Sequence, residues 1–144
     1  MDYDALAYEL LRNMRALRNA GPQKQFREGI HGETLVLFCI RDMGDHAVPG
    51  RISVAAGITS ARVAAALNGL EGKGLITRET DAGDRRRVLI RLTPKGADEV
   101  RDREKRLHGV MKAILTRLGD QDAKEYVRIT HRLAEVMANV TSVK

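Results

Sequence analysis

The sequence predicts a mainly α-helical chain with one small β-hairpin, arranged as a winged helix-turn-helix with further helices at both ends. Two observations lead to this fold class. A short helix, a glycine turn and a longer helix follow one another, and the hydrophobic period then changes from about 3.6 residues to 2. The chain has 144 residues, of which 43% are hydrophobic, so we expect residues 1–144 to form a single domain with its own core.

Two helices of different character are predicted before Gly44. Residues 3–18 form the first, and Gly21 and Pro22 end it. Residues 34–43 form the second, which is apolar on most sides and is therefore expected to be central and buried. The first helix has one apolar face, with residues at steps of three and four: Tyr3, Leu6, Leu10, Met14 and Leu17.

A helix-turn-helix is predicted between Pro49 and Lys73. Pro49 begins a short helix that ends at Gly57, where the absence of a Cβ permits a sharp turn. Thr59 is a suitable N-cap for the second helix. The inward face of this helix is predicted to carry Val63, Ala66, Leu67 and Leu70. Its outward face is predicted to carry Ala61, Arg62, Ala65, Asn68 and Gly69.

A two-stranded hairpin is expected next, because residues 75–78 and 88–92 both have the alternation of a strand. The polar segment 79–87 between them ends in three consecutive arginines. Since alternate residues of a strand face opposite sides, we expect one of the three arginines to reach a ligand. Asp84 is expected to pair with an arginine and so to fix the wing.

Two long helices complete the predicted fold. Thr93 and Pro94 place a hydroxyl at the N-cap and a proline at the first position of a helix that extends to Leu118. Gly119 separates it from the last helix. The last helix has an apolar face with the same steps of three and four residues: Tyr126, Ile129, Leu133, Val136 and Val140.

Composition excludes several classes of protein. Cys39 is the only cysteine in the sequence, which excludes an internal disulfide and suits a reducing cytoplasm, where we expect the protein to act. The longest apolar run, residues 35–40, is far shorter than the roughly 20 residues that a membrane span needs. The acidic residues 1–4 do not resemble a signal peptide. Catalytic, cofactor-binding and metal-binding motifs are absent from the sequence, so neither enzyme activity nor a cofactor is expected.

The charge balance favours a polyanionic partner. Lysine and arginine total 25 against 19 aspartates and glutamates, which gives a formal net charge of +6. This excess does not by itself distinguish nucleic acid from an anionic membrane surface. Aromatic residues make up only 3% of the chain, which argues against binding by stacking on unpaired bases.

The predicted helix-turn-helix and wing together favour double-stranded DNA. The second helix of such a motif lays its N-terminal end, here residues 59–62, in a major groove. Arg62 can form two hydrogen bonds with a guanine edge, and Ala61 or Ala65 can contact a thymine methyl group. An arginine of the hairpin can enter a narrow minor groove. The candidate DNA-binding residues are Arg51, Thr59, Ser60, Ala61, Arg62, Ala65, Asn68, Arg85, Arg86 and Arg87.

Three motifs in this part of the chain resemble the MarR family of bacterial transcription regulators. Residues 70–78 have the sequence LEGKGLITR, and residues 92–96 have the sequence LTPKG. Between them, Asp81 precedes Asp84, Arg85 and Arg86 at the spacing of the family's wing. All three motifs occur in the order and at the spacing of the family, and they lie within residues 49–100.

The resemblance implies a homodimer whose N- and C-terminal helices interlock and which binds a palindromic operator. It also implies a repressor whose binding is relieved by a small molecule or an oxidant. We therefore expect residues 32–100 to form the DNA-binding part and residues 1–20 and 101–144 to form the dimerisation helices.

One departure from the family changes the expected base contacts. Ala64 and Ala65 stand where a polar residue followed by arginine is frequent. Contacts in the groove are therefore expected to depend more on Ser60, Arg62 and the wing than on Ala65.

Several alternatives remain open at this point. The arginine run can be a solvated turn, and the last helix can pack within one monomer. A winged helix can also bind a protein instead of an operator, although the outward face of residues 59–73 lacks large apolar anchors. Cys39 can be a redox sensor, but its apolar neighbours favour a buried structural role. A zinc site at His31, Glu33 and Cys39 is the weakest alternative.

Overall fold

The protein is described by a computed structural model that covers residues 1–21 and 32–140. Its chain divides into two compact units, Met1–Leu107 and His108–Lys144. Pro22, which is predicted to end the first helix, and His31, a predicted zinc ligand, lie outside the described residues, as do residues 141–144.

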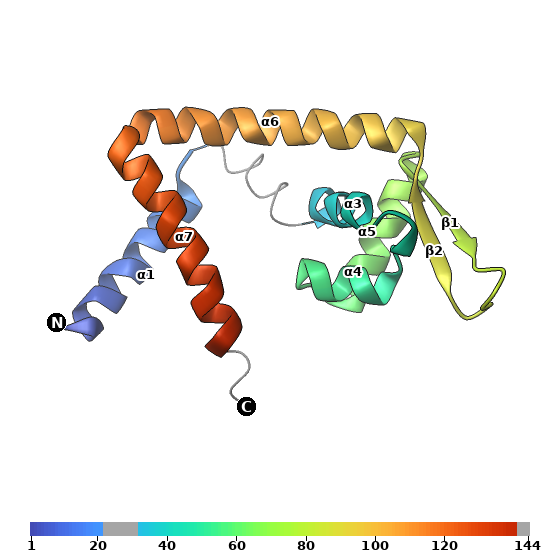
Figure 1. Ribbon diagram of the computed structural model, residues 1–144, viewed down its shortest axis with the longest axis horizontal. Coiled ribbons are helices and arrows are strands. Elements are labelled where there is room, and N and C mark those ends of the chain that lie inside the picture. The colour runs from blue at the N-terminus through green and yellow to red at the C-terminus, as the bar shows by residue number, and fades with distance from the viewer. Residues whose placement is uncertain (22–31, 141–144) are drawn as a thin grey trace. The chain divides into compact units, whose positions relative to one another are not determined.

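The elements follow the order that the sequence predicts (Figure 1). The first unit contains α1 (Tyr3–Asn19), α3 (Gly32–Met43), the 3-10 turn η1 (Gly44–His46), α4 (Pro49–Ala56), α5 (Ser60–Gly72), β1 (Ile76–Thr80), β2 (Val88–Leu92) and the first part of α6 (Pro94–Leu118). The second unit contains the rest of α6 and α7 (Asp120–Val140). The predicted fold class, mainly α with one antiparallel hairpin as a wing, is confirmed.

The helix ends coincide with the residues that predict them. Pro49 occupies the first turn of α4, and Gly57 ends that helix in the left-handed conformation, with φ of 63°. The Thr59 Oγ1 accepts a hydrogen bond of 3.2 Å from the Arg62 N–H, as an N-cap does. Gly119, with φ of 85°, separates α6 from α7.

The core of the first unit lies among α3, α4, α5 and the hairpin. These elements, together with η1 and the start of α6, are called the winged head. The buried residues of α3 and α5 confirm the predicted central helix and the predicted inward face. Each fully buried branched side chain contributes roughly 1.5–3 kcal/mol to the stability of the fold. Since the buried residues of α5 all lie on its inward face, the cluster holds α5 to the head by that face only. Its members are Val36, Leu37, Ile40, Ala47, Ile52, Val63, Ala66, Leu67, Leu70, Leu75, Ile76, Ile90 and Val100.

The first strand is longer than the sequence predicts. β1 continues to Thr80 and does not stop at residue 78, because Glu79 and Thr80 pair with Leu89 and Val88. An exposed edge strand can carry polar side chains. Because the last residues of β1 are polar, the hydrophobic pattern does not show where the strand ends. The turn of the wing is correspondingly shorter than the predicted segment 79–87.

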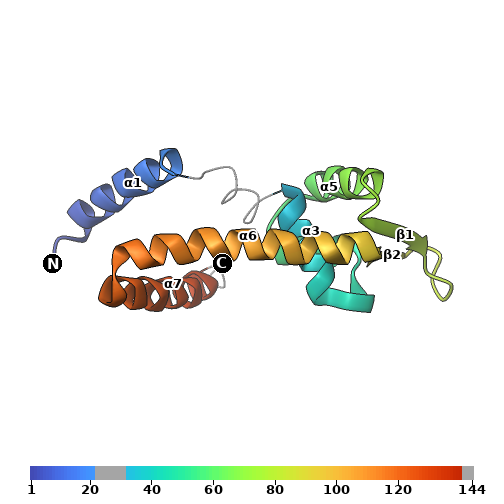
Figure 2. The same cartoon turned by 90° about the horizontal axis from the view of Figure 1, so that it is seen from above.

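A second difference is η1, which the hydrophobic pattern does not predict because one 3-10 turn is too short to show a period. Directly after η1, the Ala47 carbonyl accepts a hydrogen bond of 3.0 Å from the Ile90 N–H. This bond supports the edge of β2 that does not face β1. The hairpin is therefore anchored to the helices as well as to itself, and both views show its tip away from α3 and α4 (Figures 1 and 2).

The end of α5 and the start of α6 meet at a tight junction, which we call the α5–α6 corner (Gly74, Leu75, Thr93 and Gly96). The Thr93 hydroxyl donates a 2.6 Å hydrogen bond to the Gly74 carbonyl and accepts one of 2.9 Å from the Gly96 N–H. The Thr93 N–H donates to the Leu75 carbonyl at 3.0 Å. A Cβ on Gly96 would lie only 1.9 Å from the Leu75 carbonyl oxygen, so this approach of two backbones requires glycine.

Two helices carry exposed apolar stripes. All five predicted apolar residues of α7 are exposed in the single chain, and Leu133 at the centre of the stripe is 52% exposed. The predicted apolar residues of α1, from Tyr3 to Leu17, are exposed as well. Over residues 1–21 and 32–140, no helix is both long and apolar enough to cross a membrane.

The α5–α6 corner gives the first testable prediction. The substitution Gly96→Ala forces a methyl group against the Leu75 carbonyl, so we expect it to lower the free energy of unfolding by about 1–3 kcal/mol in urea denaturation. Gly72→Ala is the matched control, because a Cβ there meets no atom within 4 Å. This control should leave stability unchanged or raise it by up to about 1 kcal/mol. Equal stabilities of the two variants would contradict the close approach.

Candidate nucleic-acid interface

The first part of the candidate interface is the exposed face of α5. Thr59, Ser60, Ala61, Arg62, Ala65 and Asn68 are all exposed, as the sequence predicts for the candidate residues of this helix. Ala64 is exposed beside them, so small side chains line most of this face. A helix with such a face allows its backbone to approach a groove wall closely.

Gly69 is the exception among the residues predicted to face outward. It is only partly exposed, because the Glu33 carboxylate of α3 lies against it, and a Cβ on Gly69 would come within 2.0 Å of the Glu33 Oε1. The same carboxylate forms a 2.5 Å ion pair with the Lys73 Nζ at the end of α5. Gly69 therefore provides room for a contact between α3 and α5.

The turn between α4 and α5 is held by a hydrogen bond that the sequence does not disclose. The Ser53 Oγ donates to the Ile58 carbonyl over 2.7 Å, and the Ile58 N–H donates back to the Ser53 carbonyl over 3.3 Å. Serine at this position is small enough for the two helices to approach. Its hydroxyl also satisfies a carbonyl in the turn, which helps to fix the angle at which α5 leaves α4.

The N-terminus of α5 is electrostatically suited to an anion. Its first turn contains no acidic residue, and the helix dipole places partial positive charge at this end. The first N–H groups of a helix have no partner within the helix, and here only that of Arg62 is capped by Thr59. Ser60 and Ala61 therefore offer backbone donors to a phosphate oxygen.

The wing turn is closed by two aspartates that bond to backbone. The Asp81 Oδ1 accepts from the Gly83 N–H over 2.9 Å, and the Asp84 Oδ1 accepts from the Arg86 N–H over 3.0 Å. The sequence predicts that Asp84 pairs with an arginine side chain, but within the described chain it makes no ion pair. A carboxylate that accepts from an N–H two residues later closes an Asx turn. The Asp84 side chain therefore fixes the wing by bonding to the backbone of the wing and not to an arginine side chain.

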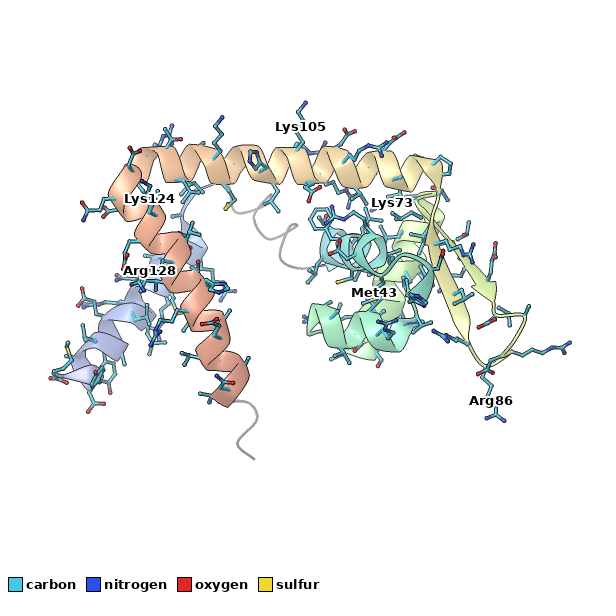
Figure 3. All side chains as sticks on the ribbon, viewed as in Figure 1. Met43, Lys73, Arg86, Lys105, Lys124 and Arg128 are labelled. Atoms are coloured by element: carbon cyan, nitrogen blue, oxygen red, sulfur yellow. The ribbon has the colours of Figure 1, made fainter. Side chains whose placement is uncertain are left out.

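All three wing arginines are exposed and lie in the turn, before the first residue of β2. The alternation that applies to strand residues therefore does not apply to them. Arg85, Arg86 and Arg87 make no side-chain ion pair or hydrogen bond with the residues that the structure describes. Figure 3 shows the Arg86 side chain extending away from the tip of the wing. Their charges are accordingly available for a ligand.

Arg51 extends the basic surface onto α4. It is exposed, and its Nη1 donates a hydrogen bond of 3.3 Å to the His46 carbonyl of η1. One guanidinium nitrogen is thus used to hold the side chain beside η1. The remaining N–H groups of Arg51 are free to donate to another ligand.

A network that the sequence does not predict connects the hairpin to the exposed face of α5. The Arg78 guanidinium on β1 donates to both carboxylate oxygens of Glu71, over 2.8 and 3.2 Å, and to the Asn68 Oδ1 over 2.8 Å. This hydrogen bonding lowers the pKa of Glu71 and raises the pKa of Arg78. The spacing of three residues between Asn68 and Glu71 places both on one side of the helix, but it does not show which strand residue meets them.

Cys39 has the environment of a structural cysteine. It is partly buried and packs against the core. Burial is the main reason why its pKa is raised, and the charge of Asp42 raises it further, so the reactive thiolate is disfavoured. Among the described residues no group of three or more histidine, cysteine or acidic side chains is placed to hold a metal ion.

Comparison with known proteins finds similarity to one family of regulators. Residues 31–87, which run from α3 to the wing, match the model of the MarR family. The uncharacterised HTH-type transcriptional regulator YdgJ of Bacillus subtilis is 25% identical over 112 residues, or 78% of this chain and 68% of that protein. The region from α3 to the wing is therefore similar to the MarR family. The matched region contains every candidate residue of the interface.

Solved structures of MarR-type regulators share its fold. MarR of Staphylococcus aureus, solved with salicylate and kanamycin, aligns over 95% of each chain with a TM-score of 0.75 at 20% identity. The transcriptional repressor CouR, solved with a 23-mer DNA duplex, aligns over 95% of this chain and 92% of its own with a TM-score of 0.65 at 23% identity. At these identities, the similarity establishes a common MarR-type winged helix fold.

Proposed function

We propose that this protein is a MarR-family regulator that represses transcription. In this proposal it binds a palindromic operator as a homodimer, with α5 in a major groove and the wing in the adjoining minor groove. The observation that carries this proposal is the joining of two electropositive features in the winged head. One feature is the N-terminus of α5, whose first turn has no acidic residue. The other is the wing, whose arginines have no ion-pair partner in the part of the chain that the structure describes. Because the α5–α6 corner and the core hold both features, they can engage one duplex together.

The candidate residues other than Asn68 have the following places in this proposal. Residues 59–62 lie in the major groove, where the Arg62 guanidinium can donate two hydrogen bonds to guanine and Ala61 can contact a thymine methyl group. Ala65 lies one turn further along the same face. Arg85, Arg86 and Arg87 supply the charge that a narrow minor groove attracts, and Arg51 is placed to contact a phosphate.

The exposed apolar stripes of α1 and α7 support the homodimer. An apolar stripe of several large residues in water favours association, and a second copy of the chain offers the same stripe for a two-fold contact. Residues 1–20 and 101–144 are the proposed dimerisation helices. A two-fold dimer of helix-turn-helix heads binds two half-sites about one helical turn apart, which requires a palindromic operator.

A small-molecule effector is the third part of the proposal, and the salicylate in the Staphylococcus aureus MarR structure supports it by analogy. An effector can release DNA only if it binds more tightly to a dimer whose head spacing does not match the operator. Because the proposed ligand is chromosomal DNA, we also propose that the protein acts in the cytoplasm.

The competing function is a winged helix that binds an acidic protein and no operator. Protein–protein interfaces are anchored by a few large aromatic or aliphatic residues. The exposed face of α5 instead carries alanines, Arg62 and Asn68. This composition favours a groove of DNA over a protein surface.

Selection of bound duplexes from a random DNA pool, at low and at moderate salt, tests the proposed function. We expect a palindrome with half-sites about one turn apart to be enriched at both salt concentrations. Enrichment without a palindrome would contradict the two-fold dimer. No enrichment at either salt concentration, with binding that only weakens as salt rises, would indicate phosphate contacts alone and contradict the operator.

Removal of Arg62 should change sequence preference. We expect Arg62→Ala to weaken binding to the selected operator by about 1–3 kcal/mol and to relax the preference at one base pair of each half-site. Competition between single-base variants of the operator measures both effects. Normal affinity together with normal preference would show that this end of α5 is not in the groove.

Removal of Arg86 should have a different signature. We expect Arg86→Ala to weaken binding to all duplexes to a similar extent and to reduce the slope of log K against log salt by about 1. Arg101→Ala is the charge-matched control, because Arg101 is already paired with Asp98 on α6. A slope that changes equally in both variants would mean that net charge, and not the wing, determines the effect.

Placing a charge on the stripe of α7 should separate the protomers. We expect Leu133→Glu to shift the protein from dimer to monomer in sedimentation equilibrium and to abolish binding to the full palindrome. Lys124→Glu introduces the same side chain on the opposite side of α7 and should remain dimeric. A dimeric Leu133→Glu variant would contradict the proposed role of this stripe.

A further inference from the structure

The contact between Arg78 and Asn68 determines which way the Asn68 side-chain amide faces. The Arg78 Nη2 lies 2.8 Å from the Asn68 Oδ1. A guanidinium group has five N–H donors and no acceptor, so only the amide oxygen can face it favourably. The amide nitrogen, with its two N–H donors, is therefore directed away from Arg78.

Arg78 itself is occupied by Glu71. Its Nε and Nη2 donate to the two carboxylate oxygens of Glu71, and its side chain is only 30% exposed. The opposite charge of Glu71 neutralises the guanidinium locally, which makes Arg78 a poor phosphate contact. Its bond to Asn68 is therefore the route by which it can influence a ligand on the exposed face of α5.

From this geometry we propose that Arg78 is a positioning residue. It orients the Asn68 amide so that the amide N–H groups donate to a phosphate oxygen of the operator. The proposal rests on the proposed function and adds a residue outside the set that the sequence predicts. It also assigns Asn68 to affinity and not to sequence preference, since a phosphate contact is the same for every base.

Two observations favour a phosphate over a base as the partner of Asn68. An asparagine that recognises adenine directs its oxygen to N6 and its nitrogen to N7 at the same time. Here the amide oxygen is turned towards Arg78 on β1, which uses one of its two lone pairs and fixes the direction of the amide. Asn68 also lies about two turns after Ala61 on the same face of α5, away from the N-terminal end that contacts base edges in a helix-turn-helix.

Lysine cannot replace Arg78 in this role. The planar guanidinium has nitrogens at fixed angles, which allows it to bond Glu71 twice and Asn68 once. An ammonium group is a single point of donation on a flexible stem. Arg78→Lys therefore keeps the charge beside Glu71 but loses the fixed orientation of the Asn68 amide.

A double-mutant cycle tests the proposal with the operator from the selection experiment and a scrambled duplex of equal length. Dissociation constants are measured by fluorescence anisotropy for wild type, Asn68→Ala, Arg78→Lys and the double variant. We expect Asn68→Ala to weaken binding to both duplexes by a similar factor, about fivefold to tenfold for one lost hydrogen bond. Arg78→Lys should weaken binding less, and it should have no further effect once Asn68 is alanine.

Additive effects in this cycle would overturn the proposal, because Arg78 would then act without Asn68. A loss at Asn68→Ala that is confined to the operator would also overturn it, because Asn68 would then recognise a base. Thermal unfolding of each variant verifies that the winged head remains folded at the assay temperature.

Asn68→Asp separates positioning from a purely structural role. The variant keeps the acceptor for Arg78 but removes both N–H donors, so it should remain as stable as wild type and bind DNA no better than Asn68→Ala. Wild-type affinity in Asn68→Asp would overturn the proposal. Wild type and Arg86→Ala are measured in the same assay. If wild type does not bind the operator, the proposed function itself is contradicted. If wild type binds the operator and the cycle is additive, only the role of Arg78 is overturned.

Discussion

The close approach of two backbones at the α5–α6 corner is the constraint on which the winged head depends. Gly96 allows the first turn of α6 to lie against the Leu75 carbonyl, and the Thr93 hydroxyl bonds to both sides of the junction. Four elements meet there, because α5 ends, β1 begins, β2 ends and α6 begins within these few residues. The direction of α5, the root of the hairpin and the start of α6 are consequently fixed together, and a change at this corner would alter all three.

This constraint explains how a small head can present both parts of the proposed DNA-binding surface at once. The buried face of α5 is held in the core, which leaves a face of small side chains and Arg62 exposed. The hairpin is held at its root by the corner, on its edge by the Ala47 carbonyl and on its side by Arg78. Its tip is closed by aspartates that bond to backbone N–H groups, and the wing arginines form no ion pair with residues 1–21 or 32–140. The shape of the head and the availability of its charges thus have the same origin.

The helices, their caps and the inward face of α5 could be predicted because each depends on residues close together in the sequence. Periodicity located α3 and α5, and Pro49, Gly57 and Thr59 predicted where α4 and α5 begin and end. The features that were missed depend on side chains from different elements. The contact of Glu33 with Gly69 and the bond from Arg78 to Asn68 join residues that no local pattern relates. The same holds for β1, whose last two residues are strand only because β2 pairs with them.

The central claim is that the exposed face of α5 and the wing form one DNA-binding surface, and amide chemical shifts measured during titration with the selected operator test it most directly. The account predicts that the largest shift changes fall within residues 59–68 and 81–87 and that both segments titrate with the same midpoint. Residues 120–140 should change little, because α7 is proposed to contact the second protomer and not the DNA. Changes concentrated in residues 120–140, or changes at α5 without any at the wing, would contradict the account.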